Sequence, residues 1–155
     1  MITDIRTILI AEDNANDVEL TLEALRENRL ANDIVVVRDG AEALDYLFKR
    51  GSYAGRQGGN PAVMLLDLKM PKVDGIEVLR TIKGDPRLKT IPVVALTSSR
   101  EESDLVRSYN LGVNAYVVKP VSFTEFIDAV KMLGGFWAIV NQPPPEPAPP
   151  AGPGD

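Results

Sequence analysis

Residues Val63 to Gly75 read V-M-L-L-D-L-K-M-P-K-V-D-G, and this stretch determines the expected fold. Its four consecutive apolar residues, Val63 to Leu66, are typical of a strand buried on both faces of a parallel sheet. Asp67 follows at the edge where open α/β sheets bind ligands. Met70-Pro71 predicts a turn, and Asp74-Gly75 leads into a helix. Asp67 is therefore a candidate functional residue, although an Asp at this place can also serve only to cap the turn.

Apolar runs elsewhere in the chain alternate with helical patterns. The other predicted strands are Thr7 to Ala11, Ile34 to Val37, Ile91 to Leu96 and Ala115 to Val118. Strand and helix alternate five times with short connections, which predicts right-handed βαβ units in one parallel sheet. The fold class is therefore α/β, a doubly wound five-stranded parallel sheet with helices on both faces.

The predicted helices are recognised by apolar spacing and capping residues. The first is capped by Asn14 or Asn16, the second runs to about Arg50, the third ends at Gly84, the fourth opens at Ser98 or Ser99, and the last opens at Ser122. A glycine-rich loop, Gly51 to Pro61, separates the second helix from the central strand.

Composition excludes several kinds of chemistry. The 155 residues include no Cys and no His, so disulfides, thiolate sites, imidazole bases and His metal ligands are all excluded. The net charge of −5, without a basic cluster, argues against a nucleic-acid partner. No apolar run is long enough to span a membrane and no secretory signal is visible, so we expect a cytoplasmic protein.

Four predicted strands end in residues that suit phosphoryl chemistry, namely Glu12-Asp13, Asp67, Thr97 and Lys119. Three carboxylates at one edge repel each other unless a cation neutralises them. Oxygen ligands without His or Cys suit Mg²⁺, or Mn²⁺ in its place. A carboxylate beside such a metal is a competent nucleophile toward phosphorus, and Lys119 and Thr97 offer donors to the phosphoryl oxygens.

These residues resemble the receiver domain of two-component response regulators. The resemblance rests on Glu12-Asp13, on L-L-D-L-K-M-P-K-V-D-G around Asp67, on Thr97 in A-L-T-S-S and on Y-V-V-K-P ending at Pro120, and it covers Thr7 to Leu133. It implies the CheY-like, flavodoxin-like (βα)5 fold with strand order 2-1-3-4-5. It also implies a cis Lys119-Pro120 bond.

The resemblance assigns roles to individual residues. Asp67 would be the phosphoacceptor, receiving its phosphoryl group from a sensor histidine kinase, and Lys119 and Thr97 would hold that group. Asp13, Asp67 and the backbone carbonyl of Lys69 would bind the metal, with Glu12 assisting. The chain would signal by changing its protein contacts, and would be no enzyme beyond catalysing its own phosphorylation and slow dephosphorylation.

Two further features follow from the resemblance. Thr97 and Tyr116 would form a switch in which the hydroxyl moves toward the phosphoryl group and the ring fills the space left behind. The resemblance also implies that Lys69 and Ser99, two residues after Asp67 and Thr97, would tune the lifetime of the phosphoryl group. Glu12 departs from the Asp found in many receivers, and its longer side chain allows a looser metal geometry.

The last predicted helix carries more apolar residues than one domain needs. Phe123, Phe126, Val130, Leu133, Trp137 and Val140 recur at spacings of three and four, and Met132, Phe136 and Ile139 form a second set. No DNA-binding or enzymatic module is visible after the receiver, so we expect output through protein contact. Exposed apolar surface of this kind predicts a homodimer through an extended last helix and the adjacent face of the fourth helix and fifth strand, with Phe136, Trp137 and Val140 at the interface. The alternative is a segment that folds back on its own domain.

The domain organisation expected is a receiver over residues 1–140 and a tail over residues 141–155. Seven of the 13 residues from Pro143 to Asp155 are proline, which predicts a disordered or polyproline II segment. The long loop before the central strand and the ending G-G-F-W-A-I-V-N-Q-P-P-P resemble a narrower group, the stand-alone receivers that partner phytochrome-type histidine kinases. A bacteriophytochrome is therefore the expected kinase.

Three alternatives remain in view. A haloacid-dehalogenase-type phosphatase also uses an Asp nucleophile after a strand, but it needs a second Asp two positions on, where this chain has Lys69. A flavodoxin-like carrier needs a phosphate-binding loop where Glu12 and Asp13 would repel phosphate. A pseudo-receiver that acts as a scaffold without phosphorylation would not need the full set of acidic, Thr and Lys residues.

Overall fold

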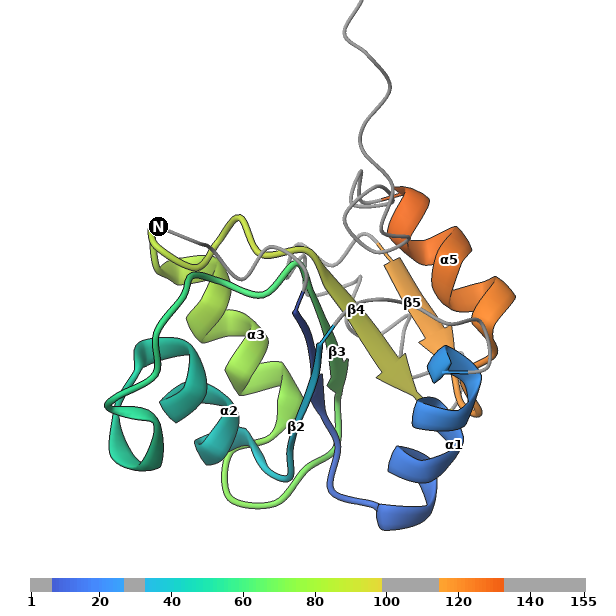
Figure 1. The fold of residues 1–155 in the computed structure, drawn as a ribbon, viewed down its shortest axis with the longest axis horizontal. Coiled ribbons are helices and arrows are strands. Elements are labelled where there is room, and N and C mark those ends of the chain that lie inside the picture. The colour runs from blue at the N-terminus through green and yellow to red at the C-terminus, as the bar shows by residue number, and fades with distance from the viewer. Residues whose placement is uncertain (1–6, 27–32, 99–114, 133–155) are drawn as a thin grey trace, which may run out of the picture.

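The sheet of this protein has the topology predicted from the sequence. The computed structural model describes residues 7–26, 33–98 and 115–132. Five parallel strands lie in the order β2-β1-β3-β4-β5, as Figure 1 shows. They are β1 (Ile8–Ala11), β2 (Ile34–Val37), β3 (Val63–Asp67), β4 (Val93–Thr97) and β5 (Ala115–Val118). This order places β1 and β3 in the centre, so the residues after them lie at the middle of the carboxyl edge.

Helices cover both faces of this sheet. They are α1 (Ala15–Arg26), α2 (Gly40–Phe48), α3 (Gly75–Gly84) and α5 (Phe123–Met132). Figure 1 shows α2 and α3 on one face and α1 and α5 on the other. Two of the predicted caps are confirmed, because Asn14 Oδ1 accepts the amide of Asp17 at 2.9 Å and Ser122 Oγ accepts that of Glu125 at 3.2 Å.

The two faces bury separate apolar clusters. One cluster joins α2 and α3 to the sheet through Leu9, Met64, Leu66, Leu79 and Ile82, and all five are fully buried. The other joins α1 and α5 to the sheet, with Leu25 and Phe126 fully buried. Every residue of β1, β3 and β4 is buried, as expected for strands covered on both faces. A sheet packed in this way fixes the carboxyl ends of its strands firmly.

Some predicted boundaries shift by a few residues. Helix α2 ends at Phe48 rather than near Arg50, because Lys49 takes a left-handed conformation (φ 57°) and its amide bonds back to the helix. The glycine-rich loop begins with a short 3-10 helix, η1 (Gly51–Tyr53). The Lys119-Pro120 bond is cis, as the family resemblance implied.

Several predicted features lie outside the described residues. These are the fourth helix after Ser98, the apolar positions beyond Met132, including Phe136, Trp137 and Val140, and the proline-rich tail. The limits of 1–140 and 141–155 therefore stay predictions. Among the residues that the structure describes, no helix is both long and apolar enough to cross a membrane.

Candidate functional site

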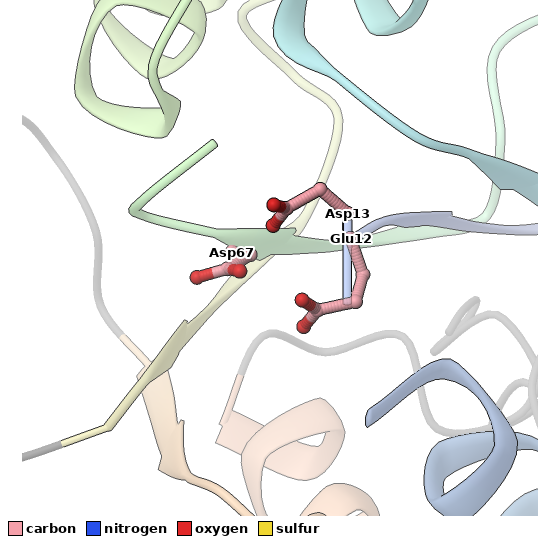
Figure 2. Close-up of side chains that lie close together, drawn as sticks. All are labelled: Glu12, Asp13 and Asp67. Atoms are coloured by element: carbon pink, nitrogen blue, oxygen red, sulfur yellow. The ribbon is translucent and has the colours of Figure 1, made fainter. Parts of the chain in front are cut away.

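Three carboxylates meet at the carboxyl edge of the sheet. Glu12 and Asp13 follow β1, and Asp67 is the last residue of the neighbouring strand β3. One carboxylate oxygen from each lies within 4.8 Å of the other two, and Figure 2 shows the three side chains converging. Glu12 and Asp67 are buried, at 1% and 4% exposure, whereas Asp13 is exposed. The cluster is thus buried at Glu12 and Asp67 and open to solvent at Asp13.

Lys119 supplies the positive charge of the cluster. Its ammonium nitrogen lies 3.2 Å from Glu12 Oε1, 3.3 Å from Asp67 Oδ2 and 3.0 Å from Asp17 Oδ2. The Lys119 side chain is 16% exposed. Burial alone would lower its pKa, but the hydrogen bonds and charges of Asp17, Asp67 and Glu12 outweigh that effect and raise the pKa above its usual value. Lys119 therefore stays charged and offsets part of the carboxylate repulsion.

One lysine does not balance this group of acids. Burial, and then hydrogen bonding and repulsion from Asp67, raise the pKa of Glu12 to about 7, although the amide of Asn14 and the charge of Lys119 act in the opposite direction. The Asn14 amide donates to Glu12 Oε2 at 3.1 Å. The site thus favours an added positive charge, either a proton or a cation. Its donors are carboxylate oxygens with solvent access, which fit a hard divalent metal ion.

The backbone after β3 holds Asp67 in place. The amide of Lys69 donates to Asp67 Oδ1 at 3.1 Å, while the amide of Leu68 donates to the Leu96 carbonyl at 3.2 Å. A Cβ on Gly75 would overlap the Asp67 carbonyl and lie 2.6 Å from Leu68 Cα, so glycine lets α3 start directly against this strand. The Asp74-Gly75 pair, read from the sequence as a helix start, thus also fixes the position of Asp67.

Thr97 and Tyr116, the two residues of the predicted switch, lie on the neighbouring strands β4 and β5. Thr97 ends β4 and is fully buried, and its carbonyl accepts the amide of Lys119 at 2.8 Å. Tyr116 on β5 is in register with Ala95, two residues before Thr97. Because alternate residues share a face, Thr97 and Tyr116 project from the same face of the sheet. Tyr116 is half-buried there against the cluster under α2 and α3.

The structure adds two residues that the sequence analysis missed. Asp17, in the first turn of α1, contacts Lys119. Asp13 precedes α1, so helical spacing does not relate it to Asp17, and no local pattern in the sequence predicts the contact with Lys119. Arg38, after β2, donates from its guanidinium to the Asp13 carbonyl at 3.1 Å. The pairing of β2 with β1 brings Arg38 there, and no local motif predicts it.

Comparison with known proteins agrees with this geometry. The model of the response regulator receiver domain family matches residues 8–131. The response regulator Rcp1 of Synechocystis sp. is 39% identical over 132 residues, covering 85% of this chain and 88% of Rcp1. A solved structure of Rcp1 in its Mn²⁺-bound form has a TM-score of 0.66, with 86% of this chain and 92% of that chain covered.

Two further solved structures are similar. The bacteriophytochrome response regulator AtBRR is 65% identical, with a TM-score of 0.84, and the match covers 88% of this chain and 98% of AtBRR. The phosphorylated cyanobacterial phytochrome response regulator RcpA is 44% identical, with a TM-score of 0.68, over 85% of this chain and 93% of RcpA. With the family model matching most of its length, this chain belongs to the receiver domain family of two-component response regulators.

Proposed function

We propose that Asp67 accepts a phosphoryl group from the phosphohistidine of a sensor histidine kinase, with Mg²⁺ or Mn²⁺ bound at the carboxylate cluster. The observation that carries the proposal is the position of Asp67. Its Oδ2 lies 3.3 Å from the Lys119 ammonium, and its carboxylate lies within 4.8 Å of those of Glu12 and Asp13. The carboxylate proposed as nucleophile, a cation and two further carboxylates therefore lie together at the carboxyl edge of the sheet.

The chemistry assigns each residue a role. An oxygen of Asp67 attacks phosphorus, the bond from phosphorus to the kinase imidazole breaks, and the imidazole leaves with its electron pair. Asp13, Asp67 and the Lys69 carbonyl would hold the metal, with Glu12 assisting; when bound, the metal neutralises charge on the phosphoryl oxygens. Lys119 and the hydroxyl of Thr97 would donate to the remaining oxygens. The half-open site around Asp13 leaves a path for the donor.

The switch would use Thr97 and Tyr116. Both project from one face of the sheet, and Tyr116 lies two residues before Val118, the register partner of Thr97. Movement of the Thr97 hydroxyl toward a phosphoryl group on Asp67 would open space that the half-buried Tyr116 ring can enter. The output is then a change in the surface near β5 rather than a new active site.

The kinase and the assembly follow from the relatives and from the sequence. Similarity to AtBRR and RcpA supports a phytochrome-type kinase, and the match to AtBRR favours a bacteriophytochrome. We propose that the exchange takes place in the cytoplasm. Homodimerisation would use Phe136, Trp137 and Val140 of the extended last helix, ahead of a proline-rich tail. Sedimentation of the double variant Phe136→Ala/Trp137→Ala tests this: we expect a monomer, and an unchanged dimer would reject the interface.

The phosphoacceptor is tested by intact-mass spectrometry after incubation with acetyl phosphate, and in parallel with a cognate kinase, with and without Mg²⁺. We expect one Mg²⁺-dependent phosphoryl adduct that is labile at alkaline pH and absent in Asp67→Asn. The matched control is Asp74→Asn, because Asp74 lies in the same loop and Asn keeps its capping of Glu77. A phosphoryl adduct on Asp67→Asn would refute the assignment of Asp67. Absence of an adduct on the wild-type protein with both acetyl phosphate and the kinase would also refute it, and would favour a scaffold that acts without phosphorylation.

A further inference from the structure

The predicted metal ligands come from two separate loops. Asp13 belongs to the loop between β1 and α1, whereas Asp67 and Lys69 lie at the end of β3 and in the loop that follows. Mg²⁺ requires nearly ideal octahedral geometry at short distances, so the two loops must be held at a fixed separation. Groups behind the ligands usually provide such positioning in metal sites.

We infer that the corner between β2 and α2, formed by Arg38, Asp39 and Gly40, holds these two loops together and so sets the geometry of the metal site. The inference rests on the proposed function. It goes beyond it by assigning a positioning role to three residues that touch no metal, phosphoryl group or reacting atom.

Arg38 attaches the corner to the first loop. Its guanidinium donates to the Asp13 carbonyl at 3.1 Å, and its own amide donates to Glu42 Oε1 at 2.9 Å. The bond to Asp13 involves the backbone rather than the carboxylate. It therefore leaves the carboxylate free for a metal while fixing the backbone from which that carboxylate projects.

Asp39 attaches the corner to the second loop. Its Oδ1 accepts the amide of Glu42 at 2.7 Å, which caps α2, while its Oδ2 lies 3.4 Å from the ammonium of Lys72. Lys72 stands three residues after Lys69 and has a left-handed backbone (φ 68°), which is uncommon for a residue other than glycine. The ion pair thus contacts the loop at its conformationally least favourable residue.

Gly40 brings the two backbones into direct contact. A Cβ at this position would overlap the carbonyl oxygen of Val73 and lie 2.8 Å from the Val73 Cβ. Any larger residue would therefore push the second loop away from the corner. The sheet order explains the arrangement, because β2 and β3 flank β1 and the corner can reach past β1 to both loops.

The long loop before β3 contacts α2, the helix that begins at this corner. The Tyr53 hydroxyl donates to Glu42 Oε2 at 2.6 Å, and the Tyr53 ring packs edge-on against Tyr46 with centroids 5.2 Å apart. The Glu42 carboxylate therefore accepts bonds from the Arg38 amide and from the Tyr53 hydroxyl of η1, while the Glu42 amide donates to Asp39. The loop before β3 therefore stabilises the corner through Glu42 and, within the described residues, makes no hydrogen bond or ion pair of its own with the predicted metal ligands.

The test is Mg²⁺ binding to the phosphoryl-free protein by titration calorimetry, for wild type, Arg38→Gln, Lys72→Gln and the double variant. Both substitutions remove a cation near an acidic site, so charge alone predicts tighter Mg²⁺ binding. Loss of positioning predicts weaker binding. We expect each single variant to bind Mg²⁺ about three- to tenfold more weakly than wild type. Loss of a group that bonds directly to a metal ligand usually lowers metal affinity by about 10- to 100-fold. The effect should be smaller here, because Arg38 and Lys72 position only the backbone of the two loops.

Controls separate positioning from charge and from folding. Arg50→Gln removes an exposed cation that pairs with Asp45 at 2.9 Å and touches neither loop, and it should bind like wild type. Lys72→Arg keeps the ion pair and should restore affinity. Lys72 is 69% exposed, so its variants should fold even if Arg38→Gln does not. Because calorimetry is run far below the melting temperature, a merely structural loss of stability leaves the affinity unchanged.

Each outcome decides the matter. Weaker binding in Lys72→Gln, restored in Lys72→Arg, supports the inference. Binding in Lys72→Gln that equals or exceeds that of wild type overturns it, and so does weaker binding that Lys72→Arg does not restore. Absence of Mg²⁺ binding in wild type would instead refute the proposed function, so the two failures are distinguishable.

Discussion

The ammonium of Lys119 lies 3.0 Å from a carboxylate oxygen of Asp17, which joins α1 to the residue after β5 across 102 positions of sequence. This contact is the shortest of the three that Lys119 makes with carboxylates. It holds the ammonium near Glu12, which follows β1, and 3.3 Å from Asp67 Oδ2. Asp17 therefore helps determine the position of Lys119, the proposed donor to a phosphoryl group.

Asp17→Asn should destabilise the metal-free protein by about 1 kcal/mol at pH 7. A charge-assisted hydrogen bond is lost, while relief of repulsion in the acidic cluster offsets part of the cost. Urea denaturation without Mg²⁺ measures this change. Glu19→Gln, an exposed position on the same helix, is the control and should leave the midpoint unchanged. A more stable Asp17→Asn would show that repulsion outweighs the ion pair.

Asp13→Asn should have opposite effects with and without metal. Removing one of three neighbouring carboxylates relieves repulsion, so the melting temperature of the metal-free protein should rise. In wild type, Mg²⁺ at a hundred times its dissociation constant should add about 2.7 kcal/mol of stability, and in the variant most of that gain should vanish. Thermal unfolding with and without Mg²⁺ measures both effects, with the exposed Asp128→Asn as control. An equal Mg²⁺ gain in both proteins would remove Asp13 from the metal site.

The sequence predicted those parts of the site that strand ends provide. Alternating apolar runs placed Asp13, Asp67, Thr97 and Lys119 after parallel strands, and parallel strands bring their carboxyl ends to one edge. The order of strands came from family resemblance rather than from periodicity, since apolar runs do not encode which strand pairs with which. The confirmed fold thus rests on both kinds of argument.

Contacts that depend on the pairing of distant elements were not predictable. Arg38 reaches Asp13 because β2 pairs with β1, and Asp39 reaches Lys72 because α2 begins beside the loop after β3. Both residues look like ordinary turn residues in sequence. The early end of α2 depends similarly on a left-handed Lys49, a conformation that sequence patterns predict for glycine or asparagine.

The Tyr53 hydroxyl should titrate well above its usual range. Burial, followed by the hydrogen bond and charge of Glu42, raises the pKa of Tyr53 from 10.0 to about 12. Since the folded pKa lies above the unfolded value, the stability that this bond contributes is fully present below pH 10 and is lost as pH rises toward 12. Tyr53→Phe should therefore cost about 1 kcal/mol at pH 8, and progressively less above pH 10.

The difference in ultraviolet absorbance between wild type and Tyr53→Phe isolates this single phenol during an alkaline titration. We expect its midpoint near pH 12, and urea denaturation at pH 8 gives the accompanying stability loss. Glu42→Gln serves as the control, because it removes the acceptor charge and should bring the Tyr53 midpoint back toward pH 10. A wild-type midpoint near 10 would mean that the bond to Glu42 does not persist in solution.

The two glycines at the ends of α3 should respond to alanine in opposite directions. At Gly75 a Cβ would overlap the backbone of Asp67 and lie 2.6 Å from Leu68 Cα, so alanine must displace the start of the helix or the end of β3. We expect a loss of at least about 2 kcal/mol, in the range typical of overpacked sites, together with slower phosphorylation because Asp67 moves. At Gly84 a Cβ meets nothing within 4 Å, so alanine should stabilise the protein by about 0.5–1 kcal/mol through helix propensity. Urea denaturation of the two variants side by side measures both signs, and a Gly75→Ala variant as stable as Gly84→Ala would show that the contact between α3 and β3 does not constrain Asp67.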